Sequence, residues 1–169
     1  MLQVPEESDD IKRLIDRLPK LASSTKPLTV DEAEALIASD NDLFDTVATY
    51  KWGDPDTFED RPHETGKLIK ILKRIKPFTP YFKTFYRGQP YADIQDSVVM
   101  KRGLRSWSAN RDTAEDFARG SRDGIVLVRT GPVKGVEISG ILMWRMRMTP
   151  ESHYSGMQAE WLLLDPGIK

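Results

Sequence analysis

The chain has 169 residues, of which 39% are apolar, and its 25 Lys and Arg nearly balance its 26 Asp and Glu. That length and apolar content suffice for one buried core, and the charge balance gives no overall field that would attract nucleic acid or an anionic membrane. The chain has no cysteine, which excludes disulfides, thiolate metal sites and a cysteine nucleophile.

The two histidines, His63 and His153, lie far apart in the sequence. A catalytic triad built on histidine and a histidine-rich metal site therefore have little support, and we expect no metal. The first residues are acidic, and no apolar run approaches the roughly 18 residues of a membrane span. We therefore predict neither a signal peptide nor a membrane span, and a protein that acts in the cytoplasm.

The first part of the chain has the apolar spacing of helices. The apolar face from Ile11 to Leu18 predicts a first helix, which Pro19 is expected to end. Thr29 and Glu32 have the spacing of a capping box and predict a second helix that runs to about residue 38. Both helices present one apolar face, so both are expected to pack on a common core.

Two further helices are predicted over residues 43–50 and 64–75, and residues 51–62 between them are predicted to be a loop. Pro77 follows the second of these helices and is expected to close it. The surface of that helix opposite its apolar stripe carries four cations: Lys67, Lys70, Lys73 and Arg74. A solvated face is the usual meaning of such a pattern, and phosphate binding is the alternative.

From Phe82 onward the pattern changes to that of strands. The predicted strands are residues 82–86, 104–108, 125–129, 133–138, 141–148 and 160–164. A helix is predicted over residues 112–119, opened by a capping box of Asp112 and Glu115. Helices followed by strands predict an α+β fold in one domain of residues 1–169, with a helical region (1–78) and a β-rich core (79–169).

Three short motifs occur in a fixed order, each at the end of a predicted strand. They are Arg87-Gly88, Ser106-Trp107-Ser108 and Gln158-Ala159-Glu160. In this order and spacing they resemble the mono-ADP-ribosyltransferases of the Arg-Ser-Glu type, over residues 82–167. The resemblance implies an ADP-ribosyltransferase-like mixed β core of two packed sheets, behind an N-terminal helical region, and implies NAD as the substrate. Enzymes of this type are typically bacterial toxins or phage effectors.

The chemistry that the resemblance implies needs a carboxylate. Breaking the bond between nicotinamide and ribose develops positive charge on the sugar, so a carboxylate beside the ribose stabilises the transition state. Glu160 stands at the start of an apolar strand that can hold it rigidly. The resemblance implies that Glu160 bonds the 2′-hydroxyl of the nicotinamide ribose. Without the other two motifs, an ordinary exposed glutamate would be the preferred interpretation.

The other two motifs would bind NAD. The guanidinium of Arg87 suits phosphate oxygens, and Gly88 lets a ligand approach the backbone; a structural ion pair is the alternative for Arg87. The resemblance implies that the Ser106 hydroxyl orients Glu160 and that Ser108 matches the last serine of the family's strand. Because side chains alternate along a strand, Trp107 should point away from both hydroxyls.

Three more residues near these motifs are candidates. Gln158 faces the same way as Glu160 on an extended segment, and in the family a glutamine here accompanies acceptors other than arginine. Tyr154 resembles the family's target-recognition aromatic residue. Arg122 lies in the loop 120–124, from which it could reach the NAD phosphates or simply form a turn. The predicted acceptor is therefore a non-arginine group on a macromolecule, in the first place a protein and otherwise a nucleic acid.

Three functions are compatible with these residues. The leading one is an NAD-dependent ADP-ribosyltransferase; the alternatives are an NAD glycohydrolase on the same fold and a noncatalytic interaction module with a vestigial cleft. Members of the family often have another strand after the glutamate strand, whereas this chain ends at Lys169. We therefore expect an open sheet edge at the last strand, which a partner could cover.

Overall fold

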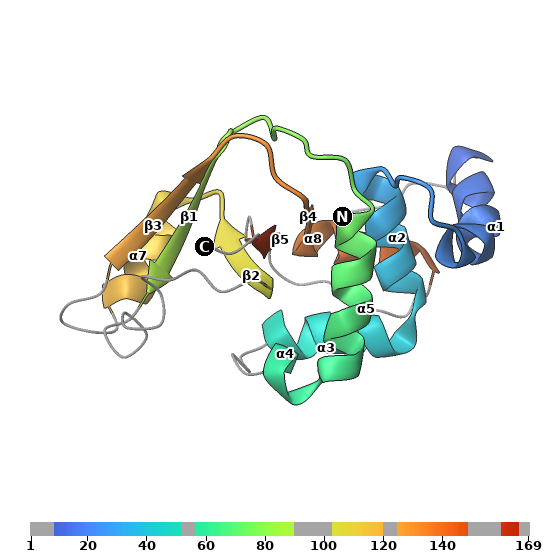
Figure 1. Ribbon diagram of the computed structural model, residues 1–169, viewed down its shortest axis with the longest axis horizontal. Coiled ribbons are helices and arrows are strands. Elements are labelled where there is room, and N and C mark those ends of the chain that lie inside the picture. The colour runs from blue at the N-terminus through green and yellow to red at the C-terminus, as the bar shows by residue number, and fades with distance from the viewer. Residues whose placement is uncertain (1–8, 52–56, 90–102, 120–124, 149–159, 166–169) are drawn as a thin grey trace, which may run out of the picture.

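The computed structural model describes residues 9–51, 57–89, 103–119, 125–148 and 160–165, and it has an α+β fold (Figure 1). The helices are α1 (Asp9–Ser23), α2 (Val30–Ser39), α3 (Asn41–Lys51), α4 (Thr57–Asp60), α5 (Pro62–Lys73), α7 (Arg111–Arg119) and α8 (Ile138–Met148). The strands are β1 (Thr84–Gln89), β2 (Gly103–Ser108), β3 (Ile125–Thr130), β4 (Gly135–Glu137) and β5 (Glu160–Asp165). The predicted fold class is confirmed. No helix in these ranges is long and apolar enough to cross a membrane.

The described strands form one sheet in the order β3-β1-β2-β5-β4, and every described pairing is antiparallel. The expectation of two packed sheets of mixed character is therefore wrong for this part of the chain. The sheet nevertheless has two portions, because β1 pairs with β3 along its whole length but with β2 only at Tyr86 and Ser108. In Figure 1, α7 lies beside the β1-β3 portion, whereas α2 to α5 lie toward the other portion.

The last strand, β5, lies inside the sheet and not at its edge. It pairs with β2 on one side, where Glu160 is opposite Ser108, and with β4 on the other, where Trp161 is opposite Glu137. A Cβ atom at Gly135 would lie 2.5 Å from the carbonyl oxygen of Leu162, so this close pairing of β4 with β5 requires glycine. The expected open edge at the last strand is therefore wrong.

The helix boundaries correct two predictions. Pro19 does not end α1, which continues to Ser23. A proline inside a helix removes one backbone hydrogen bond, and here the helix is held on both sides of Pro19 because Leu18 is buried and Leu21 packs against the same core. Residues 57–60 form the short helix α4 within the segment that was predicted to be a loop.

The predicted N-terminal cap is confirmed for α2, whereas the cap of α7 lies at another residue than predicted. The Thr29 side chain accepts a hydrogen bond from the Glu32 backbone at 3.1 Å, and the Glu32 carboxylate accepts one from the Thr29 backbone at 2.9 Å. The capping box of α2 is thus confirmed. Helix α7 begins one residue before Asp112, and Asn110 accepts a hydrogen bond from the Asp112 backbone at 2.9 Å. Its cap is Asn110, because an Asx side chain placed before the first turn satisfies that free N–H.

The predicted strand over residues 141–148 is wrong, since Ile138–Met148 is helix α8. In a short, largely apolar run the spacing of polar and apolar residues has no clear period. A buried helix and a buried strand therefore cannot be distinguished from such a sequence. In the fold Ile138, Ile141 and Leu142 are all buried, which is the spacing of a helical face packed on the core. The strand predicted over residues 133–138 is reduced to β4.

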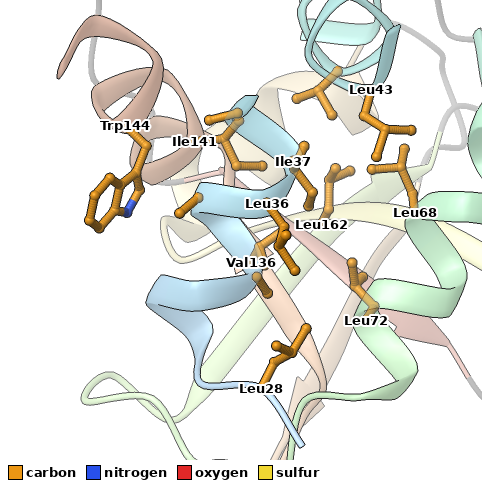
Figure 2. Packing of buried hydrophobic residues seen from close by; sticks show 14 of the residues in the cluster. Leu28, Leu36, Ile37, Leu43, Leu68, Leu72, Val136, Ile141, Trp144 and Leu162 are labelled. Carbon is orange, nitrogen blue, oxygen red and sulfur yellow. The ribbon is translucent and has the colours of Figure 1, made fainter. Parts of the chain in front are cut away.

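The main core lies between the helices and one face of the sheet (Figure 2). Helix α2 contributes Leu36 and Ile37, helix α5 contributes Leu68 and Leu72, and Leu162 comes from β5. A second cluster covers the opposite face: Phe85, Trp107, Val133, Trp161 and Leu163. Both faces of β5 are thus buried at Trp161, Leu162 and Leu163, and β2 is anchored by the buried Trp107.

One of the buried side chains of α2 is acidic, that of Glu34. Glu34 is only 5% exposed, and its carboxylate accepts a hydrogen bond from the Glu137 backbone at 3.0 Å. Burial raises the pKa of Glu34 from 4.5 to about 8; the Glu137 hydrogen bond lowers it, and the carboxylates of Asp31 and Glu137 raise it further. Glu34 is therefore held in its protonated form at the contact between α2 and β4.

Replacing Glu34 with glutamine should remove a pH dependence of stability. Because the pKa of Glu34 is higher in the folded than in the unfolded chain, the wild type should lose stability as pH rises from about 4.5 through about 8. Glu34→Gln keeps a carbonyl oxygen for the Glu137 backbone and should lose less. The measurement is the free energy of unfolding by denaturant across this pH range. Glu59→Gln, at an exposed position, is the control, and equal slopes for all three proteins would contradict the prediction.

Candidate active site

The structure brings Arg87, Ser106 and Glu160 together, and it adds Tyr50 from helix α3. The Tyr50 hydroxyl donates a hydrogen bond to Ser106 Oγ at 2.5 Å. Arg87 Nη1 donates to the Ser106 carbonyl oxygen at 2.7 Å and lies 3.5 Å from Ser106 Oγ. The Glu160 carboxylate is hydrogen bonded to the Ser106 side chain. Ser106 is thus the shared partner of the other three residues.

The hydrogen-bonding capacity of Ser106 accounts for this arrangement. A serine hydroxyl has one proton to donate and two lone pairs that can accept. Ser106 Oγ accepts from Tyr50 and from Arg87 Nη1. Its one proton is therefore left for Glu160. The three contacts fix the direction of the Ser106 hydroxyl, and with it the position of the Glu160 carboxylate.

The charge state of Glu160 depends on opposing effects. Burial raises its pKa above the ordinary value of 4.5, whereas the positive charge of Lys51, the hydrogen bond from Ser106 and the charge of Arg87 each lower it. The net direction is upward. A carboxylate that is partly removed from water but faces two cations is a common feature of sites where charge develops during a reaction.

Arg87 retains a donor that the fold does not use. Its Nε atom is buried and has no hydrogen-bond partner among the described residues. A buried, unpaired donor is destabilising, and it is rare unless a ligand or water satisfies it. A phosphate oxygen is a suitable partner, because guanidinium groups bind such oxygens through charge-assisted hydrogen bonds. Arg87 is therefore a candidate for binding an anionic group.

Tyr50 was not among the residues predicted from sequence. Its ring stacks on Phe58 of α4, with the ring centroids 4.5 Å apart and the planes at 26°. The contact with Ser106 joins positions 56 residues apart in the sequence. No local pattern around Tyr50 signals such a contact, so only the tertiary fold could reveal it.

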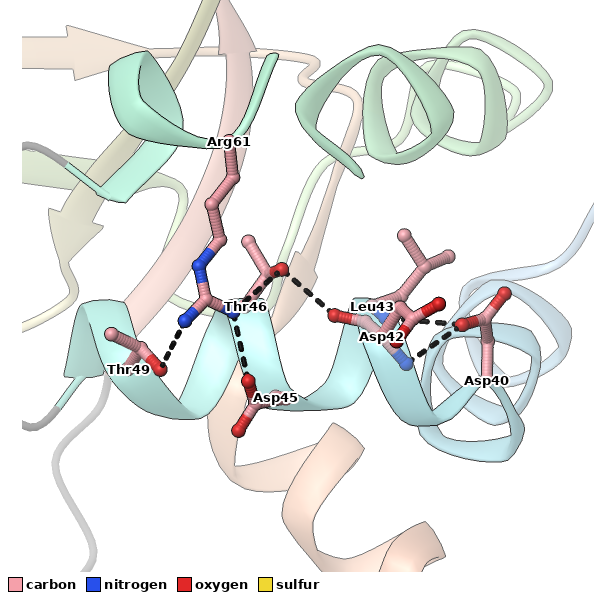
Figure 3. Close-up of polar contacts among 7 residues, drawn as sticks. All are labelled: Asp40, Asp42, Leu43, Asp45, Thr46, Thr49 and Arg61. Atoms are coloured by element: carbon pink, nitrogen blue, oxygen red, sulfur yellow. Dashed lines mark hydrogen bonds and ion pairs between the residues drawn. The ribbon is translucent and has the colours of Figure 1, made fainter. Parts of the chain in front are cut away.

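Arg61 contacts three side chains of α3, the helix that carries Tyr50 (Figure 3). Its Nη1 donates to the Asp45 carboxylate at 2.9 Å and to Thr46 Oγ1 at 3.3 Å, and its Nη2 donates to Thr49 Oγ1 at 3.4 Å. These three partners lie along α3, and Arg61 directly precedes α5. The Arg61 guanidinium thus connects α3 to the segment that joins α4 and α5. One of its partners, Thr49, directly precedes Tyr50.

The remaining predicted site residues fall into two groups. Gly88 lies in β1 opposite Val126, and Ser108 Oγ accepts a hydrogen bond from the Asn110 backbone at 2.9 Å. Ser108 therefore stabilises the turn before α7, although it is paired with Glu160 across β2 and β5. Arg122, Tyr154 and Gln158 lie outside the described residues. Trp107 is buried in the second cluster, on the face away from Ser106, as predicted.

No protein-family model and no curated protein matches the chain. Two solved structures match it over 95% of its length and 76% of theirs, each with a TM-score of 0.34: ADP-ribosyltransferase Vis in complex with agmatine, at 15% identity, and the same enzyme with the M6 inhibitor, at 17% identity. At this identity and TM-score the likeness carries no argument about this chain. The functional argument rests on the site residues themselves.

Replacing Glu160 with glutamine should stabilise the protein above pH 4.5. The pKa of Glu160 is raised in the folded chain, so ionisation becomes unfavourable for folding as pH rises from the ordinary value of 4.5. Glutamine keeps an acceptor for Ser106 and carries no charge. Thermal unfolding at several pH values should show the advantage of Glu160→Gln growing with pH. Asp60→Asn, at an exposed position, should show no such trend; an unchanged or reduced stability of Glu160→Gln at pH 8 would contradict the prediction.

Proposed function

We propose that this protein is an NAD-dependent mono-ADP-ribosyltransferase that transfers ADP-ribose to a macromolecule and releases nicotinamide. The observation that carries the proposal is the shared contact of Arg87 and Glu160 with Ser106. It places a guanidinium and a carboxylate at one point, as a substrate with a diphosphate and a reacting ribose requires. The order of the three strand-end motifs supports the same activity.

Each residue has a defined part in this reaction. Arg87 binds the diphosphate through its guanidinium, and Gly88 leaves room for the ligand beside the backbone. Ser106 holds the Glu160 carboxylate, which hydrogen bonds the ribose hydroxyl and stabilises positive charge on the sugar as the bond to nicotinamide breaks. Tyr50 is a positioning residue that acts through Ser106. We assign Ser108 and Arg122 to the rim of the NAD site.

The acceptor is a group other than arginine on a protein or a nucleic acid. Gln158 is two residues before Glu160 and is neutral, so it can hold an amide or a base edge through paired hydrogen bonds. It lacks the charge that engages a guanidinium strongly. Tyr154 completes the acceptor surface in this proposal. The enzyme acts in the cytosol of its own cell or of a target cell, as a toxin or phage effector would.

The decisive experiment uses NAD labelled on the adenylate part, the full-length protein and a cell lysate. A labelled protein or nucleic acid supports the proposal. Free labelled ADP-ribose without a labelled macromolecule would assign the site to an NAD glycohydrolase. If NAD is not consumed, the result would favour the noncatalytic binding module. Nicotinamide release, measured in the same reactions, gives the rate of bond breakage independently of the acceptor.

Replacing Glu160 with alanine should nearly abolish nicotinamide release. The carboxylate is needed most when charge develops on the ribose, so its loss acts on the transition state and leaves NAD binding largely intact. Loss of one well-placed electrostatic group should lower the rate about a hundredfold or more. The measurement is kcat for nicotinamide release, with NAD binding followed by calorimetry. Glu59→Ala is the matched control on an exposed helix. A rate of Glu160→Ala within severalfold of wild type would assign this role to another group.

Replacing Gln158 should separate transfer from hydrolysis. If Gln158 positions the acceptor, Gln158→Ala should impair labelling of the macromolecule far more than the slow hydrolysis of NAD by water, which needs only Glu160 and the NAD-binding residues. Gln158→Glu adds a carboxylate that can pair with a guanidinium and should permit some transfer to arginine or a small guanidine compound. Parallel assays of labelling and nicotinamide release decide this. Equal losses in both for Gln158→Ala would assign Gln158 to NAD binding.

A further inference from the structure

A large cavity formed by the described residues lies away from Ser106 and Glu160. It has a volume of about 1120 Å³ and is bounded by helices α1, α2, α5 and α8, with the start of α3 at one end. None of the four residues that meet at Ser106 lines it. Its floor is apolar and is formed by Ile15, Leu18, Leu36, Leu43, Ile71 and Met148. We call it the helical groove.

Cations line the helical groove and are not balanced by acids. They are Lys67, Lys70, Lys73, Arg74 and Arg145. Asp40 is the one acidic residue among the described residues that line it. Its carboxylate already accepts hydrogen bonds from the backbones of Asp42 and Leu43, at 3.0 and 3.1 Å, and so caps α3 (Figure 3). The groove therefore combines an apolar floor with a rim on which five cations outnumber the one acid.

The cations of α5 form a row. Lys67, Lys70 and Lys73 are three residues apart, and at 1.5 Å per residue the row from Lys67 to Arg74 is about 10 Å long. The three lysines are exposed, and no ion pair joins them to another described residue. Arg74 donates from Nε to the Lys26 carbonyl oxygen at 3.0 Å, while its Nη2 is buried without a partner among the described residues.

We propose that the helical groove binds an acidic amphipathic helix of a protein partner. Such a helix would place apolar side chains at i, i+3, i+4 and i+7 on the floor, and carboxylates along one flank against the row of lysines. An elongated row of cations fits an elongated row of anions. The basic face of α5 is thus the rim of a binding site and not only a solvated face.

Other occupants fit the groove less well. No aromatic residue is among those that line it, so it offers nothing on which bases could stack, as a nucleic-acid site would. A fatty acid carries one charge and would leave most of the row unpaired. A second copy would need an acidic helix with an exposed apolar face. Among the described residues, the exposed large apolar side chains are Tyr81, Val128 and Met143, and only Met143 lies on a helix, the basic α8.

The test uses a fluorescent peptide of roughly four helical turns, with leucines at i, i+3, i+4 and i+7 and glutamates on one flank. We expect saturable binding to the full-length protein, measured by anisotropy, that weakens as salt is added. A peptide with lysines in place of the glutamates, and one with the leucines moved off a common face, should both bind at least tenfold more weakly. Equal binding of all three peptides would overturn the proposal.

Variants locate the binding on the groove. Lys67→Glu combined with Lys70→Glu should weaken binding of the acidic peptide about tenfold or more. Lys76→Glu combined with Lys83→Glu makes the same change of charge at exposed positions that do not line the groove, and should leave binding unchanged. Circular dichroism checks that both variants are folded. Equal weakening in both pairs, laurate in place of the peptide as the preferred ligand, or self-association that depends on Lys67 would each overturn the proposal. None of these outcomes depends on turnover of NAD.

Discussion

The hydroxyl of Ser106 is the contact on which the candidate site depends. Its three hydrogen-bonding positions are used by Tyr50, Arg87 and Glu160, which come from a helix and from two different strands. Since one hydroxyl makes all three contacts, replacing Ser106 would remove a partner from each of the other three residues. The helical region is therefore part of the site, because it supplies Tyr50, and Arg61 contacts the helix that carries it.

The surroundings of Glu160 both favour and disfavour the ionised form of its carboxylate. Burial disfavours the ionised carboxylate, whereas Lys51 and Arg87 favour it. A group in this balance stabilises developing positive charge more strongly than one in water, because less solvent screens it. The same burial lowers the stability of the fold when the group is ionised. Glu34 is also buried, but the charges of Asp31 and Glu137 raise its pKa further, and we assign its effect to stability.

Sequence patterns predicted the local features of the fold and missed those decided by tertiary contacts. The Thr29 capping box and the alternation that buries Trp107 depend on neighbours in the chain, and both were predicted. Helix α8 was mistaken for a strand, because its apolar residues are spread along the run without a clear period that would distinguish the two. The sequence also placed Arg87, Ser106 and Glu160 at strand ends, but the contribution of Tyr50 and the groove beside α5 depend on how helices pack on the sheet.

The two portions of the sheet are joined by a side chain as well as by backbone. Strands β1 and β2 share only the pair Tyr86 and Ser108, and close by, Arg87 Nη1 donates to the carbonyl oxygen of Ser106. The Arg87 guanidinium thus adds a side-chain hydrogen bond between β1 and β2, where the two strands share few backbone hydrogen bonds. If Arg87 also binds NAD as proposed, activity alone cannot separate that role from its structural one. A substitution of Arg87 also removes the hydrogen bond between β1 and β2. The free energy of unfolding of such a variant must therefore be known before a loss of turnover is attributed to a loss of NAD binding.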